Sequence, residues 1–165
     1  MLRLKPKEEA LLLCYVLFFD RCTYACRLPI ADLIRTYGTP TTRTVYRGQT
    51  NSVIWTNTPF FSASPTRAMA EGYAQNNTLF RIHLNEVPCL STRSVHYTLT
   101  EGVMTELRKW DGNAALTHPK VKHAIFQKRM EEVLVLNGGT FYADAARKRH
   151  GFETRGTFKE TWYHP

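Results

Sequence analysis

Three short apolar stretches each carry one kind of polar side chain, and they constrain this chain more than any other feature. They are Thr44-Val45-Tyr46-Arg47-Gly48, Pro59-Phe60-Phe61-Ser62-Ala63-Ser64-Pro65 and Glu131-Glu132-Val133-Leu134-Val135-Leu136. β-Branched and aromatic residues fill these stretches, so each predicts a β-strand. An arginine, a serine pair and a glutamate must then find partners within a sheet. Their occurrence in this order favours a functional role over three unrelated structural ones.

The first 40 residues predict helices rather than strands. Pro6 in a first turn, followed by two acidic residues, opens a helix over 6–24. A second helix begins near Pro29 and stops at Gly38. The apolar run at 10–19 is about ten residues long, too short to span a membrane. We therefore interpret it as part of a buried amphipathic helix and expect no membrane association.

Turn-prone segments, strand signals and helix signals alternate along the rest of the chain. We expect loops at 39–42 and 49–58, helices over 64–75 and 98–110, strands over 79–84 and 133–136, and a long loop or short helix over 118–129. The first of these helices begins with Ser64 as N-cap, and the second with a Thr98–Glu101 capping box. The tail from Ala143 is basic and aromatic without a clear period. Helices first and mostly strands afterwards predict an α+β fold, and the length fits one domain over 1–165.

The net charge of +8 is compatible with an acidic partner, such as a nucleic acid, a cofactor's phosphates or an acidic protein face. The basic residues are scattered rather than massed, however, which is more typical of a solvated surface. The cysteines lack the spacing of zinc ligands, so we expect no metal, and free thiols in a reducing compartment. No convincing signal peptide or translocation domain is recognisable. We therefore expect a cytoplasmic monomer, in the producing cell or in a host, as for an intracellular, phage or viral enzyme.

The polar residues of the first two strands suit the binding of a phosphate and of a carboxylate. The guanidinium of Arg47 can bind a phosphate through two hydrogen bonds, and Gly48 lets a ligand approach the backbone. Alternation places Ser62 and Ser64 on one face of the second strand. A serine among aromatic residues needs a hydrogen-bond partner, and a carboxylate is a natural one. Ser64 can cap the next helix as well.

Glu132 stands at the start of the third strand, which the apolar run after it predicts to be interior. A carboxylate is rarely buried in such a position without a partner. Glu131 should point to the opposite side, because successive side chains of a strand alternate. Glu132 is therefore the candidate acid, and an exposed glutamate at the strand start is the structural alternative.

In this order, the residues resemble the mono-ADP-ribosyltransferases of the Arg-Ser-Glu class, which include bacterial toxins, phage enzymes and vertebrate ecto-enzymes. Tyr46-Arg47-Gly48 matches their first motif. Their second motif, an aromatic-Ser-Thr-Ser strand, is matched by Phe61-Ser62-Ala63-Ser64, with alanine in place of the threonine. Glu132 and its apolar strand match the third. The matched span runs from about Thr44 to Leu136.

The resemblance implies a fold, a substrate and a role for each residue. The fold is a split β-sandwich core preceded and flanked by helices, and the substrate is NAD, without a metal. Glu132 would hold the ribose 2′-hydroxyl and stabilise an oxocarbenium-like transition state, while Ser62 orients it. Arg47 would bind the diphosphate, with Gly48 and Ser64 also contacting the cofactor. The candidates for stacking on nicotinamide are Phe60, Phe61, Tyr73 and Phe80, of which Phe61 and Tyr73 are placed in the predicted site.

Two departures from the family pattern concern the acceptor and the first motif. Met130 stands where relatives carry a glutamate or glutamine, so it supplies no carboxylate or amide to direct a nucleophile. The gap between Arg47 and Ser62 is short for the family. We expect Lys128, Arg129 and Met130 to contact a macromolecular acceptor, either a protein or a nucleic acid.

Three other interpretations remain open from the sequence. A NAD glycohydrolase would use the same residues, with water as acceptor. A basic nucleic-acid-binding module without catalysis would use the cations at 147–149 with Phe152, Phe158, Trp162 and Tyr163. A structural or interaction domain would need none of these residues for chemistry.

Overall fold

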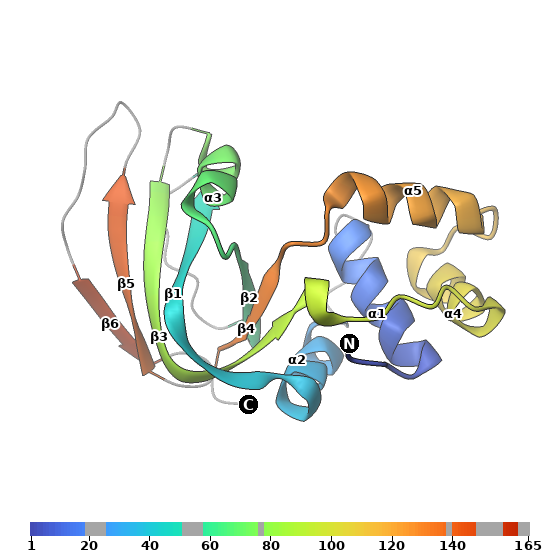
Figure 1. Cartoon of the computed structure of the whole chain (residues 1–165), viewed down its shortest axis with the longest axis horizontal. Coiled ribbons are helices and arrows are strands. Elements are labelled where there is room, and N and C mark those ends of the chain that lie inside the picture. Colours follow the sequence, from blue (N-terminus) through green and yellow to red (C-terminus); the bar gives the residue numbers. More distant parts are fainter. Residues whose placement is uncertain (19–25, 51–57, 76–77, 138–139, 148–156, 162–165) are drawn as a thin grey trace. The chain divides into compact units, whose positions relative to one another are not determined.

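The computed structural model describes residues 1–18, 26–50, 58–75, 78–137, 140–147 and 157–161, with side chains up to Asn137 (Figure 1). Its elements confirm a mixed α+β fold. The chain forms two compact units. A helical unit comprises residues 1–37 and 91–131, and a sheet unit comprises 38–90 and 132–165.

Four α-helices and one short 3-10 helix make up the described part of the helical unit. They are α1 (Pro6–Leu17), α2 (Arg27–Tyr37), η3 (Thr92–Ser94), α4 (Glu101–Asp111) and α5 (His118–Lys128). The predicted helix over 6–24 is confirmed up to Leu17, and residues 19–25 lie outside the described residues. The helix predicted from Pro29 is α2, and the segment expected as a long loop or short helix is α5.

A buried carboxylate joins α1 to the segment that precedes α4. Glu9 is fully buried, and its carboxylate accepts hydrogen bonds from the backbone N–H groups of Thr98 and Leu99 at 3.0–3.1 Å and from the Thr98 hydroxyl at 2.8 Å. Leu99 has a left-handed backbone, with φ of 50°. Several donors satisfy this charge, and in return the carboxylate holds the turn that leads into α4.

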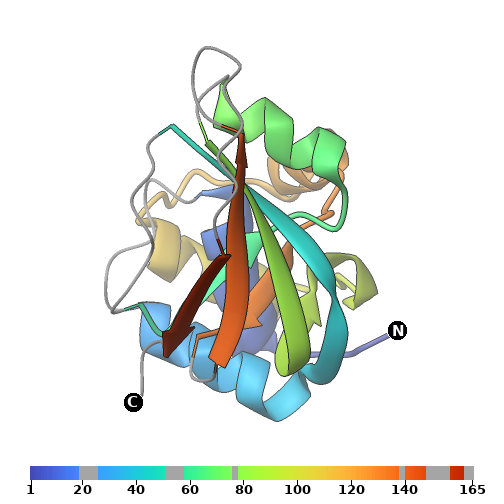
Figure 2. The same cartoon turned by 90° about the vertical axis from the view of Figure 1, so that its left-hand side faces the viewer.

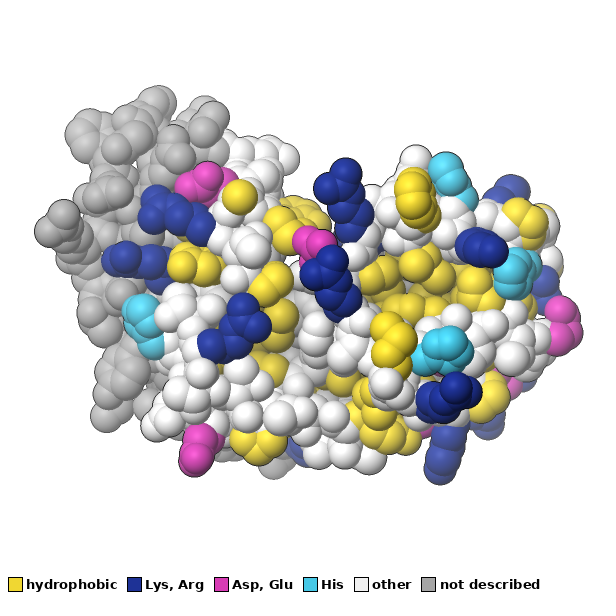
Figure 3. Space-filling model, in the orientation of Figure 1, with side chains coloured by type: hydrophobic (Ala, Val, Ile, Leu, Met, Phe, Trp, Pro, Cys, Tyr) yellow, Lys and Arg dark blue, Asp and Glu magenta, His cyan; other side chains and the backbone are white. Residues whose placement is uncertain are grey.

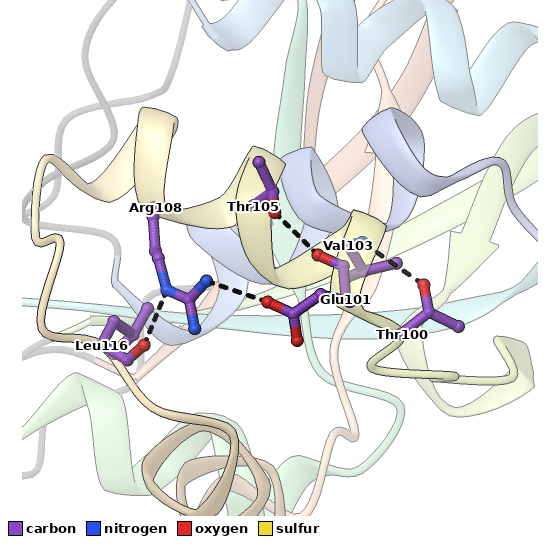
Figure 4. A network of polar contacts seen from close by, with 6 residues as sticks. All are labelled: Thr100, Glu101, Val103, Thr105, Arg108 and Leu116. Carbon is purple, nitrogen blue, oxygen red and sulfur yellow. Dashed lines mark hydrogen bonds and ion pairs between the residues drawn. The ribbon is translucent and has the colours of Figure 1, made fainter.

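Polar contacts at both ends define α4, and Figure 4 shows them. The Thr100 hydroxyl accepts from the Val103 N–H at 3.3 Å and is the actual N-cap, so the predicted Thr98–Glu101 capping box is wrong. Thr98 bonds to Glu9 instead. Near the other end, Arg108 donates through Nε to the Leu116 carbonyl at 2.9 Å, which holds the loop after the helix against it.

Six strands and one helix make up the described part of the sheet unit. They are β1 (Thr39–Gln49), β2 (Phe60–Ala63), α3 (Arg67–Ala74), β3 (Thr78–Ser91), β4 (Val133–Leu136), β5 (Thr140–Arg147) and β6 (Thr157–Thr161). The strands run in the order β2-β4-β3-β5-β6, and β1 also pairs with β3. Figure 2 shows β5, β3 and β1 side by side. All strands predicted between 44 and 136 are present.

Two local predictions for this unit are wrong, and the tail forms strands that the sequence did not predict. The segment 39–42, expected as a loop, opens β1, because Thr39 to Thr41 pair with Val87 to Cys89. Helix α3 begins at Arg67 with Thr66 at its N-cap, so Ser64 does not cap it. The tail, in which no period was evident, forms β5 and β6, which add to the sheet beside β3.

The cysteines differ from the expectation of free thiols. Cys26 is disulfide-bonded, with its partner outside the described residues, which corrects the prediction at that position. Cys14 and Cys89 are free and buried. Burial raises the pKa of the Cys89 thiol to about 11, a shift that a Thr41 hydrogen bond and the nearby Arg43 charge reduce. Within the described residues, no helix is long and apolar enough to cross a membrane.

We predict that Glu9→Ala lowers the free energy of unfolding by about 2–4 kcal/mol, because it leaves the buried N–H group of Leu99 and the partly buried N–H group of Thr98 without their acceptor. Urea unfolding followed by circular dichroism measures the change. Glu101→Ala is the matched control, since that side chain is 86% exposed and its ion pair with Arg108 is long at 3.5 Å. It should cost less than about 1 kcal/mol. Equal losses in the two variants would contradict the anchoring role of Glu9.

Candidate functional site

The pairing of β2 with β4 brings the serine and glutamate motifs together. The two strands are antiparallel, with Ser62 opposite Leu134 and Ala63 opposite Val133. The pairing ends at Ala63 and Val133, and Glu132 directly precedes β4. Ser64, directly after β2, is bridged to Tyr46 instead. The register therefore brings the serine strand beside the strand that follows Glu132.

The other face of the same strands packs into the core of the sheet unit. Phe61, Ala63, Val133 and Val135 are all buried and belong to one apolar cluster with residues of β1 and β3. Ser62 and Glu132 are only partly buried, whereas Ser64 is buried. The face of Ser62 is itself largely apolar, because Phe60 and Leu134 lie on it and are buried.

The arginine motif contacts the serine strand directly. Tyr46 and Ser64 form a β-bridge, with N–H to carbonyl distances of 2.9 and 2.7 Å. Arg47 donates through Nη1 to the Ser62 carbonyl at 2.6 Å and through Nε to Gln49 Oε1 at 2.7 Å. The short sequence gap between Arg47 and Ser62 is therefore compatible with direct contact between the two motifs.

Sequence reasoning missed Gln49, which was assigned to a polar loop. It is the last residue of β1, and its side-chain amide orients the Arg47 guanidinium. The available signal was spacing: two residues apart on a strand, Gln49 and Arg47 project to the same face.

Gly48 has a packing role that the sequence did not reveal. A Cβ atom at this position would lie 1.9 Å from the Ala70 carbonyl oxygen and 2.6 Å from the Ala74 nitrogen. Only a residue without a side chain lets β1 pass this close to α3. The α3 backbone is thus the group that approaches Gly48 closely. The predicted contact of Gly48 with a cofactor stays a prediction.

Of the four aromatic residues considered for stacking, Tyr73 is the accessible one. It lies on α3 and is 52% exposed, whereas Phe60, Phe61 and Phe80 are buried. Phe61 packs in the core of the sheet unit at 3% exposure, so its ring is not accessible where a cofactor contact was predicted.

The two adjacent glutamates have different surroundings. Glu131 belongs to the helical unit and forms an ion pair with Arg93 at 3.0 Å. Glu132 opens the sheet unit's second segment directly before β4. The opposite directions of the two carboxylates stay a prediction.

The predicted acceptor residues end the helical unit. Arg129 is the C-cap of α5 and donates its N–H to the Ile125 carbonyl at 3.1 Å. Arg129 and Met130 both have left-handed backbones, with φ of 61° and 45°. Arg129 is exposed and Lys128 partly buried, but Met130 is only 5% exposed. Its thioether packs inside the unit, which leaves the two cations as the accessible part of the predicted acceptor contact.

A separate pocket of about 560 Å³ lies within the helical unit. It has an apolar floor and a charged rim, and its lining residues are Lys7, Glu8, Leu11, Pro29, Asp32, Leu33, Thr36, Glu106, Lys109 and Trp110. None of the predicted site residues lines it. No group of histidine, cysteine or acidic side chains suited to a metal ion occurs within the described ranges.

We predict that Gly48→Ala destabilises the chain by about 3 kcal/mol, because the added methyl group would clash with backbone atoms of α3, which cannot move aside as a flexible side chain could. Thermal unfolding by circular dichroism measures it. Gly72→Ala on α3 is the matched control, since its added Cβ meets nothing within 4 Å and alanine favours a helix. That control should be neutral or slightly stabilising. A harmless Gly48→Ala would refute the tight packing of β1 on α3.

The tail residues of the nucleic-acid-binding interpretation lie beyond the part of the chain with described side chains. The candidate site therefore consists of Arg47, Ser62, Ser64 and Glu132, with Tyr73 as the accessible aromatic residue. Comparisons of the chain with protein-family models, with curated proteins and with solved structures found no match.

Proposed function

We propose that this chain is a NAD-dependent ADP-ribosyltransferase whose sheet unit is the split β-sandwich core of that class. One observation carries the proposal: β2 pairs antiparallel with β4, which brings the serine strand beside the strand that Glu132 directly precedes. The Arg47 hydrogen bond to the Ser62 carbonyl supports it, since it joins the arginine motif to the serine motif within one unit.

In the proposed reaction, the bond between nicotinamide and ribose breaks, and its electron pair returns to the pyridinium ring. Positive charge then develops on the ribose as an oxocarbenium-like cation. The Glu132 carboxylate stabilises that charge and holds the 2′-hydroxyl. Ser62 positions the carboxylate, since a diagonal neighbour on one strand face is within reach of a side-chain contact.

Arg47 binds the NAD diphosphate in this proposal. A guanidinium carries five N–H donors in a fixed fork, and its contacts with Ser62 and Gln49 set its orientation before a ligand arrives. Tyr73 is the ring proposed to stack on nicotinamide, because it is the exposed member of the aromatic set. Ser64 and the Gly48 backbone complete the proposed cofactor contacts.

The acceptor is a macromolecule, protein or nucleic acid, that attacks the ribose carbon once nicotinamide leaves. Met130 supplies neither a carboxylate nor an amide for this step and is buried, so the acceptor supplies the attacking electron pair, and Arg129 can only hold an acidic acceptor by its charge. Water as the acceptor would make the chain a NAD glycohydrolase on the same site.

We predict that Glu132→Gln lowers the rate of NAD turnover by about 10²–10³-fold, because the neutral amide cannot stabilise the developing cation. The assay incubates radiolabelled NAD with the protein and a cell lysate, then treats parallel samples with protease and nuclease. Glu131→Gln is the matched control, since its carboxylate pairs with Arg93 and should leave turnover near that of the wild type.

The treated samples separate the acceptor classes. Label released by protease indicates a protein acceptor, and label released by nuclease indicates a nucleic acid. Free ADP-ribose alone favours the glycohydrolase. Absence of NAD turnover by the folded wild-type chain, or equal turnover by Glu132→Gln, would overturn the proposal.

We predict that Arg47→Ala weakens NAD binding about tenfold or more while changing the rate of the bound complex less, because a diphosphate contact is made before and during the reaction. Isothermal titration calorimetry measures the affinity. Arg43→Ala is the control on the same strand, since that arginine is exposed and makes only a long 3.4 Å bond to the Pro65 carbonyl. An unchanged NAD affinity in folded Arg47→Ala would remove this residue from the site.

A further inference from the structure

Helix α5 lies in a long segment without acidic residues. From Gly112 to Met130 the sequence contains no Asp or Glu. The same segment holds the cations Lys120, Lys122, Lys128 and Arg129 and the histidines His118 and His123. Such a run produces a positive potential along one element, which attracts polyanions.

The cations of α5 differ from those of the neighbouring helices in their partners. On α2, Arg35 pairs with Asp32, and on α4, Lys109 pairs with Glu106. Within the described part of the chain, Lys120 and Lys122 have no hydrogen-bond or ion-pair partner. Their charge is therefore not neutralised locally.

An aromatic ring stands among these cations. Val121 is the buried residue of α5, and Phe126 is 82% exposed. Five residues along a helix correspond to a turn of about 500°, which places Phe126 on the side away from Val121. Lys122 and His123, four and three residues before it, are its neighbours on that side, and both are exposed.

We name the surface formed by Lys122, His123 and Phe126 the α5 face. Figure 3 shows dark-blue, cyan and yellow side chains gathered over α5, without magenta acidic ones among them. Isolated exposed hydrophobic residues are common and need no explanation. A ring directly beside unpaired cations is a more specific arrangement, because it offers stacking and charge in one place.

We propose that the α5 face binds single-stranded nucleic acid, with a base stacked on the Phe126 ring and a phosphate on Lys122. An acidic protein surface would satisfy the lysines but would leave the phenylalanine in water. A duplex would likewise leave the ring unused, since its bases are already stacked. A single strand uses both kinds of side chain, without sequence preference. This binding is independent of the proposed NAD chemistry.

The test measures fluorescence anisotropy of a labelled single-stranded oligonucleotide with the full chain, in the absence of NAD, at 50 and 200 mM salt. Phe126→Ala should weaken single-strand binding about tenfold, as expected for loss of one stacked base. It should leave binding of a duplex and of heparin unchanged, since neither offers an unstacked base. Leu28→Ala is the matched control, because Leu28 is an exposed apolar residue on α2; it should bind like the wild type.

A second variant tests the charge. Lys122→Ala should weaken binding of the single strand, the duplex and heparin alike, and should reduce the slope of log affinity against log salt by about 0.7 for the single strand. Lys109→Ala is the matched control, because Lys109 is already paired with Glu106 on α4. It should change neither the affinities nor the salt dependence. The proposal would be overturned if the single strand showed no salt-dependent binding, or if Phe126→Ala weakened heparin binding as much as it weakens single-strand binding. Tighter binding of an acidic polypeptide than of the oligonucleotide would overturn it as well. Because NAD is absent, none of them bears on NAD turnover.

Discussion

Strand β3 is the constraint on which the sheet unit depends. It hydrogen-bonds with β1, β4 and β5, and β2 and β6 join the sheet through β4 and β5. Its residues Leu79, Phe80, Ile82 and Leu84 are buried, so the strand contributes apolar side chains to the core as well as hydrogen bonds to its neighbours. Because β3 pairs with both β1 and β4, it brings the strands that carry Arg47 and Glu132 into one sheet.

The candidate site depends on register within this sheet. A shift of one residue between β2 and β4 would move Phe61, Ala63, Val133 and Val135 out of the apolar cluster that they form with β1 and β3, at about 25 cal/mol per Å² of apolar surface exposed. Core packing therefore sets which residues of the two strands lie opposite one another.

The sequence predicted the elements that have strong local signals. It failed where contacts with a distant segment of the chain decide the structure. Runs of aromatic and aliphatic residues located β2 and β4, and Pro6 located the start of α1. The segment at 39–42 looked like a loop because its Thr and Pro residues are turn formers, yet its pairing with β3 makes it strand. Thr98 had the spacing of a cap, but the buried Glu9 carboxylate binds it from a distant part of the chain.

The sequence alone determined the three motifs, the face on which Ser62 and Ser64 lie and the acid-free character of α5, because these follow from local spacing. Tertiary structure alone decided that Gly48 serves packing against α3, that Phe61 is buried and Tyr73 exposed, and that Arg47 bonds to Ser62. It also decided which cations remain unpaired. The physical reason is the same in each case: burial and hydrogen-bond partnership are properties of residues far apart in the chain, and they exist only once the chain has folded.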